Sequence, residues 1–113
     1  MQEMRFSKLS KPRQMLIRLC QKVNYGSILN VEVVGGDFSF DRPTEVILDL
    51  RLDDEAVARR ELELSDFGLP AETCQLLSQI DSVEKGLVEK LTIQDGVPRR
   101  LLLRRFLPLE VLR

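Results

Sequence analysis

Two stretches of the chain place apolar residues at helical spacing, and each is followed by apolar residues that alternate with polar ones. The first stretch carries one apolar stripe, formed by Met15, Leu16, Leu19, Cys20 and Val23. Ser10 can cap the start of this helix, and Pro12 suits its first turn, where a missing N–H costs little. Gly26 follows, and glycine readily forms a left-handed C-terminal cap. The pattern predicts a helix that begins near Ser10 and ends at Gly26.

A hairpin is predicted directly after this helix. Leu29, Val31 and Val33 alternate with polar neighbours, as a half-buried strand requires. Two glycines come next, and Gly36 is the second of them. Both can adopt the positive φ angles of a two-residue hairpin turn. This register places Val33 opposite Phe38, so the unit is expected to run helix, strand, turn, strand.

The second stretch repeats the plan. Pro70 opens a helix whose apolar positions are Leu76, Leu77, Ile80 and Val83. Gly86 is expected to end this helix, and the strand "LVEKLTI" leads into a turn at Asp95 and Gly96. In the simplest register of the returning strand Leu91 faces Arg100. A β-bulge near Pro98 is therefore expected, because an extra residue there would shift the pairing.

Equivalent residues of the two stretches lie sixty positions apart. The coinciding identities are Leu16 with Leu76, Val23 with Val83, Gly26 with Gly86, and Gly36 with Gly96. These matches fall at positions that decide local structure, which favours an internal repeat. The predicted repeats cover about residues 10–40 and 70–107 and would be related by an approximate twofold axis.

The connector between the repeats, residues 41–69, contains one further predicted strand. Pro43 interrupts the return strand of the first hairpin, and "EVILDLRL" (45–52) alternates well. Residues 53–69 mix helical and strand signals and are expected to be mostly irregular. The whole chain is thus predicted to be a single α+β domain, residues 1–113. It would hold an antiparallel sheet of about five strands with two helices on one face.

The segment "LIRLCQKVNYGSILNVEVVGGDFSF", and more faintly "LLSQIDSVEKGLVEKLTIQDGVPRR", resembles the small bacterial YezD-like proteins of unknown function. Tyr25, Gly26, Ser27 and Ile28 match the aromatic-Gly-Ser-hydrophobic step between helix and strand in that family. The second segment keeps the glycine and the hydrophobe, and the two segments cover about half of the chain. The resemblance implies a bacterial source and one helix with a hairpin per unit, and it carries over no catalytic residue.

The net charge of −1 conceals three segments of different sign. Residues 1–24 carry six basic and one acidic side chain, residues 25–84 carry four and fourteen, and residues 85–113 carry seven and three. If the repeats lie side by side, the basic ends could form one surface that contacts phosphates or a partner. The candidate contact residues are Lys11, Arg13, Arg18, Tyr25, Arg99, Arg100, Arg104 and Arg105. The alternative is a solvated surface whose basic residues pair with the acidic connector.

The residue types give little support to an enzyme. Histidine is absent, which removes the commonest general base and the commonest metal ligand. The two cysteines, Cys20 and Cys74, occur singly and are expected to be small buried hydrophobes. No catalytic, metal-binding or cofactor-binding residue is therefore assigned. No apolar run approaches the roughly 20 residues of a membrane span, and a bacterial cytoplasmic protein is expected.

Two functional hypotheses remain from the sequence. The first is a non-enzymatic adaptor that binds another protein or forms a homodimer, since an unpaired sheet edge accepts a further strand. The second is a nucleic-acid-associated accessory protein that contacts phosphates through its basic terminal segments. Neither a helix-turn-helix nor an aromatic-rich RNA-binding motif is found in support of the second.

Overall fold

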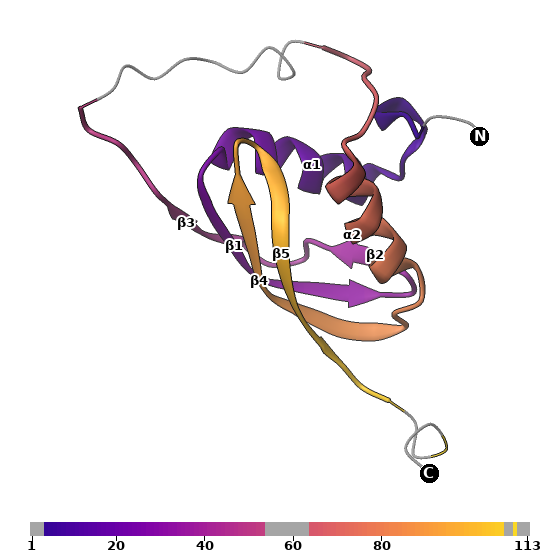
Figure 1. Ribbon diagram of the computed structural model, residues 1–113. Helices are drawn as coiled ribbons and strands as arrows, with labels where there is room; N and C mark the ends of the chain where they lie inside the picture. The colour runs from indigo at the N-terminus through magenta and orange to yellow at the C-terminus, as the bar shows by residue number, and fades with distance from the viewer. Residues whose placement is uncertain (1–3, 54–63, 108–109, 111–113) are drawn as a thin grey trace.

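The computed structural model describes residues 4–53, 64–107 and 110. Figure 1 shows a sheet with both helices on one of its faces. The elements, in chain order, are a 3-10 turn (Phe6–Lys8), α1 (Lys11–Val23), β1 (Gly26–Val34), β2 (Asp37–Ser39), β3 (Glu45–Leu48), α2 (Ala71–Asp81), β4 (Lys85–Gln94) and β5 (Val97–Arg105). The predicted α+β class, with two helices and a five-stranded antiparallel sheet, is confirmed over the described residues.

The two helices begin as predicted but end earlier. The Ser10 hydroxyl accepts a hydrogen bond from the Arg13 amide at 3.3 Å, whereas Pro70 gives α2 no side-chain cap. α1 ends at Val23, and Asn24 takes the positive φ of 63° that was expected of a glycine. Asparagine tolerates this region better than most residues. α2 ends at Asp81, so the prediction that each helix runs to a glycine was wrong.

Gly26 and Gly86 lie instead at the starts of β1 and β4, where an edge strand comes very close. A Cβ on Gly26 would overlap the carbonyl oxygen of Ile47 in β3. A Cβ on Gly86 would stand 2.6 Å from the carbonyl oxygen of Arg104 in β5. The two glycines are therefore required by close backbone packing within the sheet, not by helix termination.

The strands run in the order β2-β1-β4-β5, and β3 pairs with the other end of β1 beside β2. Both predicted two-residue turns are present: Gly36 has a φ of 76° and Gly96 a φ of 73°. Val33 lies opposite Phe38, as the alternation predicted. The register of the first hairpin was thus readable from the sequence.

The third predicted strand is shorter than expected. It covers Glu45–Leu48 and not 45–52, because Leu48 already pairs with Gly26, the first residue of β1. Beyond that pair β1 offers no further partner, and Leu50 and Leu52 are 68% and 94% exposed. Of the connector predicted to be irregular, residues 54–63 lie outside the described residues. Residues 64–69 contain no helix or regular strand, only an isolated bridge to the N-terminal segment.

The core lies between the helices and one face of the sheet. α1 and α2 contribute Leu16, Cys20, Leu77 and Ile80, which meet inward-pointing residues of the two central strands. Those strand residues are Ile28, Val31, Val33, Val88, Leu91 and Ile93, each at most 2% exposed. Burial of this apolar layer supplies the main stabilisation of the fold.

Two irregularities in the β4–β5 pairing set which side chains face the helices. Ile93 pairs with Pro98 but Thr92 pairs with Arg100, so Arg99 is an extra residue in β5. The expected bulge near Pro98 is confirmed, and it brings Leu101 opposite Leu91. A second shift, between Val88 and Lys90, restores the original register towards the end of the hairpin. Both shifts keep apolar residues on the helix side.

Candidate functional site

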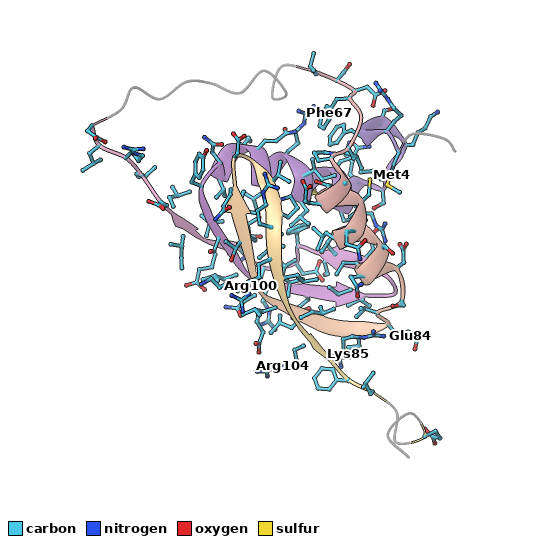
Figure 2. All side chains as sticks on the ribbon, viewed as in Figure 1. Met4, Phe67, Glu84, Lys85, Arg100 and Arg104 are labelled. Atoms are coloured by element: carbon cyan, nitrogen blue, oxygen red, sulfur yellow. The ribbon has the colours of Figure 1, made fainter. Side chains whose placement is uncertain are left out.

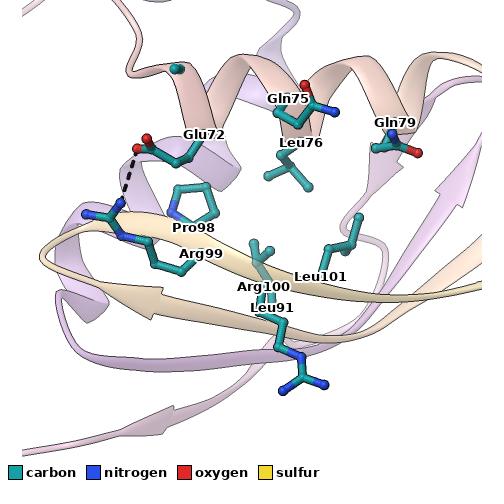
Figure 3. A pocket seen from close by; sticks show the side chains of 10 residues that line it. Glu72, Gln75, Leu76, Gln79, Leu91, Pro98, Arg99, Arg100 and Leu101 are labelled. Carbon is teal, nitrogen blue, oxygen red and sulfur yellow. Dashed lines mark ion pairs between the residues drawn. The ribbon is translucent and has the colours of Figure 1, made fainter.

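A groove of about 440 Å³ lies between α2 and β5, and we call it the β5–α2 groove. Its apolar residues are Leu76, Leu91, Pro98 and Leu101, and its polar residues include Glu72, Gln75, Gln79 and Arg99. Figure 3 shows Leu76 pointing from α2 towards the strand, with Pro98 and Leu101 pointing back towards the helix. The groove therefore has an apolar floor and a polar helical wall, which is the usual character of a protein binding site.

The bulge at Arg99 builds this floor. Side chains of a regular strand alternate, so residues three apart lie on opposite faces. The extra residue changes the alternation, and both Pro98 and Leu101 consequently face α2. Arg99 itself pairs with Glu72 at 3.4 Å and connects the strand to the first turn of α2 at one end of the groove.

β5 forms an edge of the described sheet, because β4 is its strand partner on one side and the described residues supply none on the other. In Figure 1 it is the strand nearest the viewer. An unpaired edge exposes backbone N–H and C=O groups that can pair with a further strand. The edge and the β5–α2 groove are adjacent, so a strand added to β5 would also contact the groove.

The sheet face opposite the helices carries a mixture of apolar and basic side chains, and we call it the open face. Along the strands its residues include Leu29, Glu32, Leu87, Lys90, Thr92, Arg100, Leu102 and Arg104. Arg100 points away from α2 in Figure 3, and Figure 2 labels Arg100 and Arg104 on this same side. Leu102 between them is 43% exposed.

The arginines of β5 differ in their partners. Arg104 forms an ion pair with Glu89, and Arg105 donates a hydrogen bond to the Ser82 carbonyl oxygen at 3.1 Å. Arg99 is paired with Glu72. Over the described part of the chain, Arg100 has no ion-pair partner within 4 Å. Arg100 is therefore the residue of this group most open to an external anion.

Arg13, another predicted contact residue, serves the fold. Its guanidinium donates to the Gly36 carbonyl oxygen at 2.7 Å and to the Asp81 carboxylate at 2.5 Å, and it lies 3.6 Å from Asp37. The Arg13 side chain is 14% exposed. It ties α1, the first hairpin turn and the end of α2 together and is poorly placed to meet a ligand.

Lys11 and Arg18 lie in a different place from the arginines of β5. They line a second groove of about 720 Å³ on the outer side of α1, together with Met15, Phe40 and Arg42. The Arg18 guanidinium stands over the Phe6 ring at 4.4 Å from its centroid. This groove adjoins the chain between β2 and β3, at the sheet edge opposite β5. Lys11 and Arg18 therefore line a different groove from Arg99 and Arg100, and the sequence had left open whether these residues share one surface.

Tyr25 is 46% exposed and lies beside β3, near Ile47 and Gln94.

The β5–α2 groove was not predicted from the sequence. One signal for it was available, because Gln75 and Gln79 are four apart on one face of α2 and interrupt its apolar positions. The bulge near Pro98 was a second signal.

The described residues contain no group of three or more His, Cys, Asp or Glu side chains that could hold a metal ion. None of the helices in the described ranges is long and apolar enough to cross a membrane. Burial raises the pKa of the Cys20 thiol to about 12, which keeps this thiol protonated at neutral pH. Cys74 is half-buried, and both cysteines are free.

No known family model, curated protein or solved structure matches the chain. The resemblance to the YezD-like proteins therefore stays a prediction. The case for function depends on the groove, the free edge and the open face.

Proposed function

We propose that this protein is a non-enzymatic interaction module that accepts a strand from another protein, or from a second copy of itself, at the edge of β5. The observation that carries the proposal is the nine-residue length of β5, which is paired on one side within the described residues. Strand addition at such an edge gives affinity through backbone hydrogen bonds.

The opposite edge offers a poorer template. There β2 has three residues and β3 four, and Pro43 lies in the segment between them. Short strands and prolines are the usual means by which proteins protect a sheet edge. β5 has a proline only near its start, at Pro98, which leaves Arg100–Arg105 with all of their backbone N–H groups.

The experiment places a photo-crosslinking amino acid at Leu102 on β5, in the cell that produces the protein. The control is the same residue at Met15 on α1, which is similarly exposed at 50%. We expect a discrete crosslinked species from the Leu102 position and none from Met15. Crosslinks from neither position, with a monomer by light scattering at high concentration, would overturn the proposal.

Light scattering coupled to size exclusion separates the two kinds of partner. A dimer mass for the purified chain indicates a second copy. A monomer that still crosslinks in the cell indicates a different protein.

The alternative function, binding of nucleic-acid phosphates, is supported by the arginines of β5. It is weakened because Arg99 and Arg104 are paired with carboxylates that a phosphate would have to displace. A gel-shift titration at two salt concentrations tests it, since phosphate binding falls steeply with salt. No shift at low salt, or an unchanged shift when Arg99, Arg100, Arg104 and Arg105 become alanine, would reject this alternative.

The proposal includes the internal repeat as the origin of the two unequal edges. Gly26 pairs with Ile93, and Val33 pairs with Gly86. Gly86 and Ile93 lie sixty positions after Gly26 and Val33, so each residue pairs with the counterpart of the other, as a twofold axis between β1 and β4 requires. In addition, the Gly96 amide donates to the Asn24 carbonyl oxygen, and the Gly36 amide donates to the Val83 carbonyl oxygen. Each hairpin turn is thus bound to the end of the other unit's helix, which supports a twofold relation between the units.

A further inference from the structure

We propose that the partner strand is an extended peptide segment of another protein whose side chains alternate between apolar and acidic, bound along β5 in the β5–α2 groove. This inference rests on the proposed function and names the chemistry of the partner. It follows from the different character of the two sides of β5.

The side of β5 that faces α2 selects apolar residues. Every second side chain of an added strand points to this side, about 5 Å from its neighbours on β5. At the Arg100 end of β5 it meets Leu76, Pro98 and Leu101 on the groove floor, and farther along it lies beside Leu103. Gln75 and Gln79 border the groove on α2 and can hydrogen-bond polar atoms at its rim.

The open-face side of β5 selects acidic residues. The remaining side chains of the added strand lie beside Arg100, Leu102 and Arg104. Lys90 pairs with Leu102 and adds a third cation, whereas Glu89, already paired with Arg104, is the acid on β4. Glu32, an open-face acid on β1, lies two strands away from β5 and is paired with Arg42. Beside β5 the cations therefore outnumber the acids, and Arg100 has no carboxylate partner within 4 Å in the described chain. Acidic side chains at alternate positions complement this charge.

The same charge disfavours a second copy of the chain at this edge. Two β5 strands related by a twofold axis through Leu102 would place Arg100 of one copy opposite Arg104 of the other. Like charges directly opposite each other on neighbouring strands are destabilising. Four of the nine residues of β5 are arginine, so other registers also bring arginines together. A separate acidic segment avoids this repulsion.

The backbone of β5 limits where the added strand begins. Pro98 has no N–H, and the bulge at Arg99 breaks the regular spacing of donors and acceptors. Regular pairing is therefore available from Arg100 to Arg105. Six residues fit a peptide of similar length, which places about three side chains on each side.

The test is selection of a random peptide library displayed on phage against the full chain, followed by affinity measurement on synthetic copies of the enriched peptides. We expect enrichment of peptides in which apolar and acidic residues alternate. Their binding should weaken with salt, because the pairs with Arg100 and Arg104 lie at the surface. Two peptides are compared, one N-methylated at the odd-numbered residues and one at the even-numbered residues. The peptide whose methylated N–H groups face β5 should bind at least tenfold more weakly, and the other should bind normally.

Two variants with matched controls test the site. Arg100→Glu combined with Arg104→Glu should weaken binding about tenfold, whereas Lys11→Glu combined with Lys22→Glu makes the same charge change on α1 and should have little effect. Gln79→Trp should fill the groove and weaken binding by tenfold or more. Ser78→Trp, exposed on α2 outside the groove, is its control.

Amide hydrogen exchange with and without the enriched peptide locates the binding. Protection concentrated in Arg100–Arg105 supports the inference. Peptides that bind but protect other residues, or whose affinity is unaffected by both variants, overturn the inference and leave the proposed function standing. A library that enriches nothing, together with no crosslink from Leu102, overturns both. A dimer by light scattering that is lost with the β5 variants would replace the acidic peptide with a second copy.

Discussion

The unit α1–β1–β2 and the unit α2–β4–β5 follow the same plan but end differently. In the first the returning strand stops after three residues, and β3 takes over the pairing with the other end of β1. In the second the returning strand continues for nine residues. The described sheet therefore has one edge made of two short strands and one edge made of a single long strand. The difference arises in the connector, where β2 ends at Ser39 and Pro43 follows four residues later, so the first return strand is not continued along β1.

The largest expected effects come from adding a methyl group to Gly26 or to Gly86. Gly26→Ala should lower the free energy of unfolding by about 1–3 kcal/mol. The φ of 152° at Gly26 is unfavourable for a residue with a side chain, and the Ile47 carbonyl oxygen occupies the space that a Cβ would need. Gly86→Ala should cost a similar amount, about 1–3 kcal/mol, by displacing Arg104. Urea unfolding measures both.

Hydrogen exchange distinguishes the two glycine variants. Gly26→Ala should loosen β3, and Gly86→Ala should loosen the end of β5. The control is Gly35→Asn, where nothing lies within 4 Å and asparagine before glycine favours the turn, so the change should stay within about 0.5 kcal/mol. Equal loosening of both edges by either alanine would contradict the assignment of each glycine to its own edge.

The contacts of Arg13 give the next effect. Arg13→Ala removes the donor to the Gly36 carbonyl oxygen and the pair with Asp81, and we expect a loss of about 1–2 kcal/mol in thermal or urea unfolding. Arg51→Ala, which removes an exposed pair with Asp53, should cost less than about 1 kcal/mol. If both variants lose the same stability, the guanidinium of Arg13 does not join the first turn to α2 as described.

The helix starts differ as well, and they predict changes of opposite sign. Ser10→Ala should destabilise the protein by about 1 kcal/mol, because the Arg13 amide loses its cap. Pro70→Ser should give a gain of roughly 0–0.5 kcal/mol, since a new cap is offset by a more flexible unfolded chain. A fall in the free energy of unfolding of Pro70→Ser would show that the proline stabilises the start of α2 more than a side-chain cap does.

The smallest effect at neutral pH concerns the cysteines. Cys74 should react with a thiol reagent in the native state, and Cys20 should react only on unfolding. The pKa of Cys20 is raised from 9.0 to about 12, so the unfolded thiol ionises first. Its contribution to stability is then present below about pH 9 and lost as the pH rises towards 12. Cys20→Ala should flatten the decline of stability over this range; an unchanged pH profile would exclude this cause.

The candidate site was only partly predictable from the sequence. Its cations Arg99, Arg100 and Arg104 were identified, and the bulge near Pro98 followed from the conflict between Leu91 and Arg100. Which of those arginines are paired was not predictable, because Glu72 belongs to a different element from Arg99. The apolar floor was missed because Leu76 was placed only on the apolar stripe of its helix, and Leu101 on the returning strand was given no position.

The sequence by itself determined where the helices and strands lie, apart from the helix ends and the length of β3, together with both two-residue turns and the pairing of Val33 with Phe38. These depend on periodicity and on backbone preferences of neighbouring residues, which act over a few positions. The tertiary structure alone decided that Gly26 and Gly86 admit an edge strand, that Arg13 binds Asp81 sixty-eight residues away, and that β5 borders α2. Those contacts join segments far apart in the chain, and only the packed arrangement of helices on the sheet brings them together.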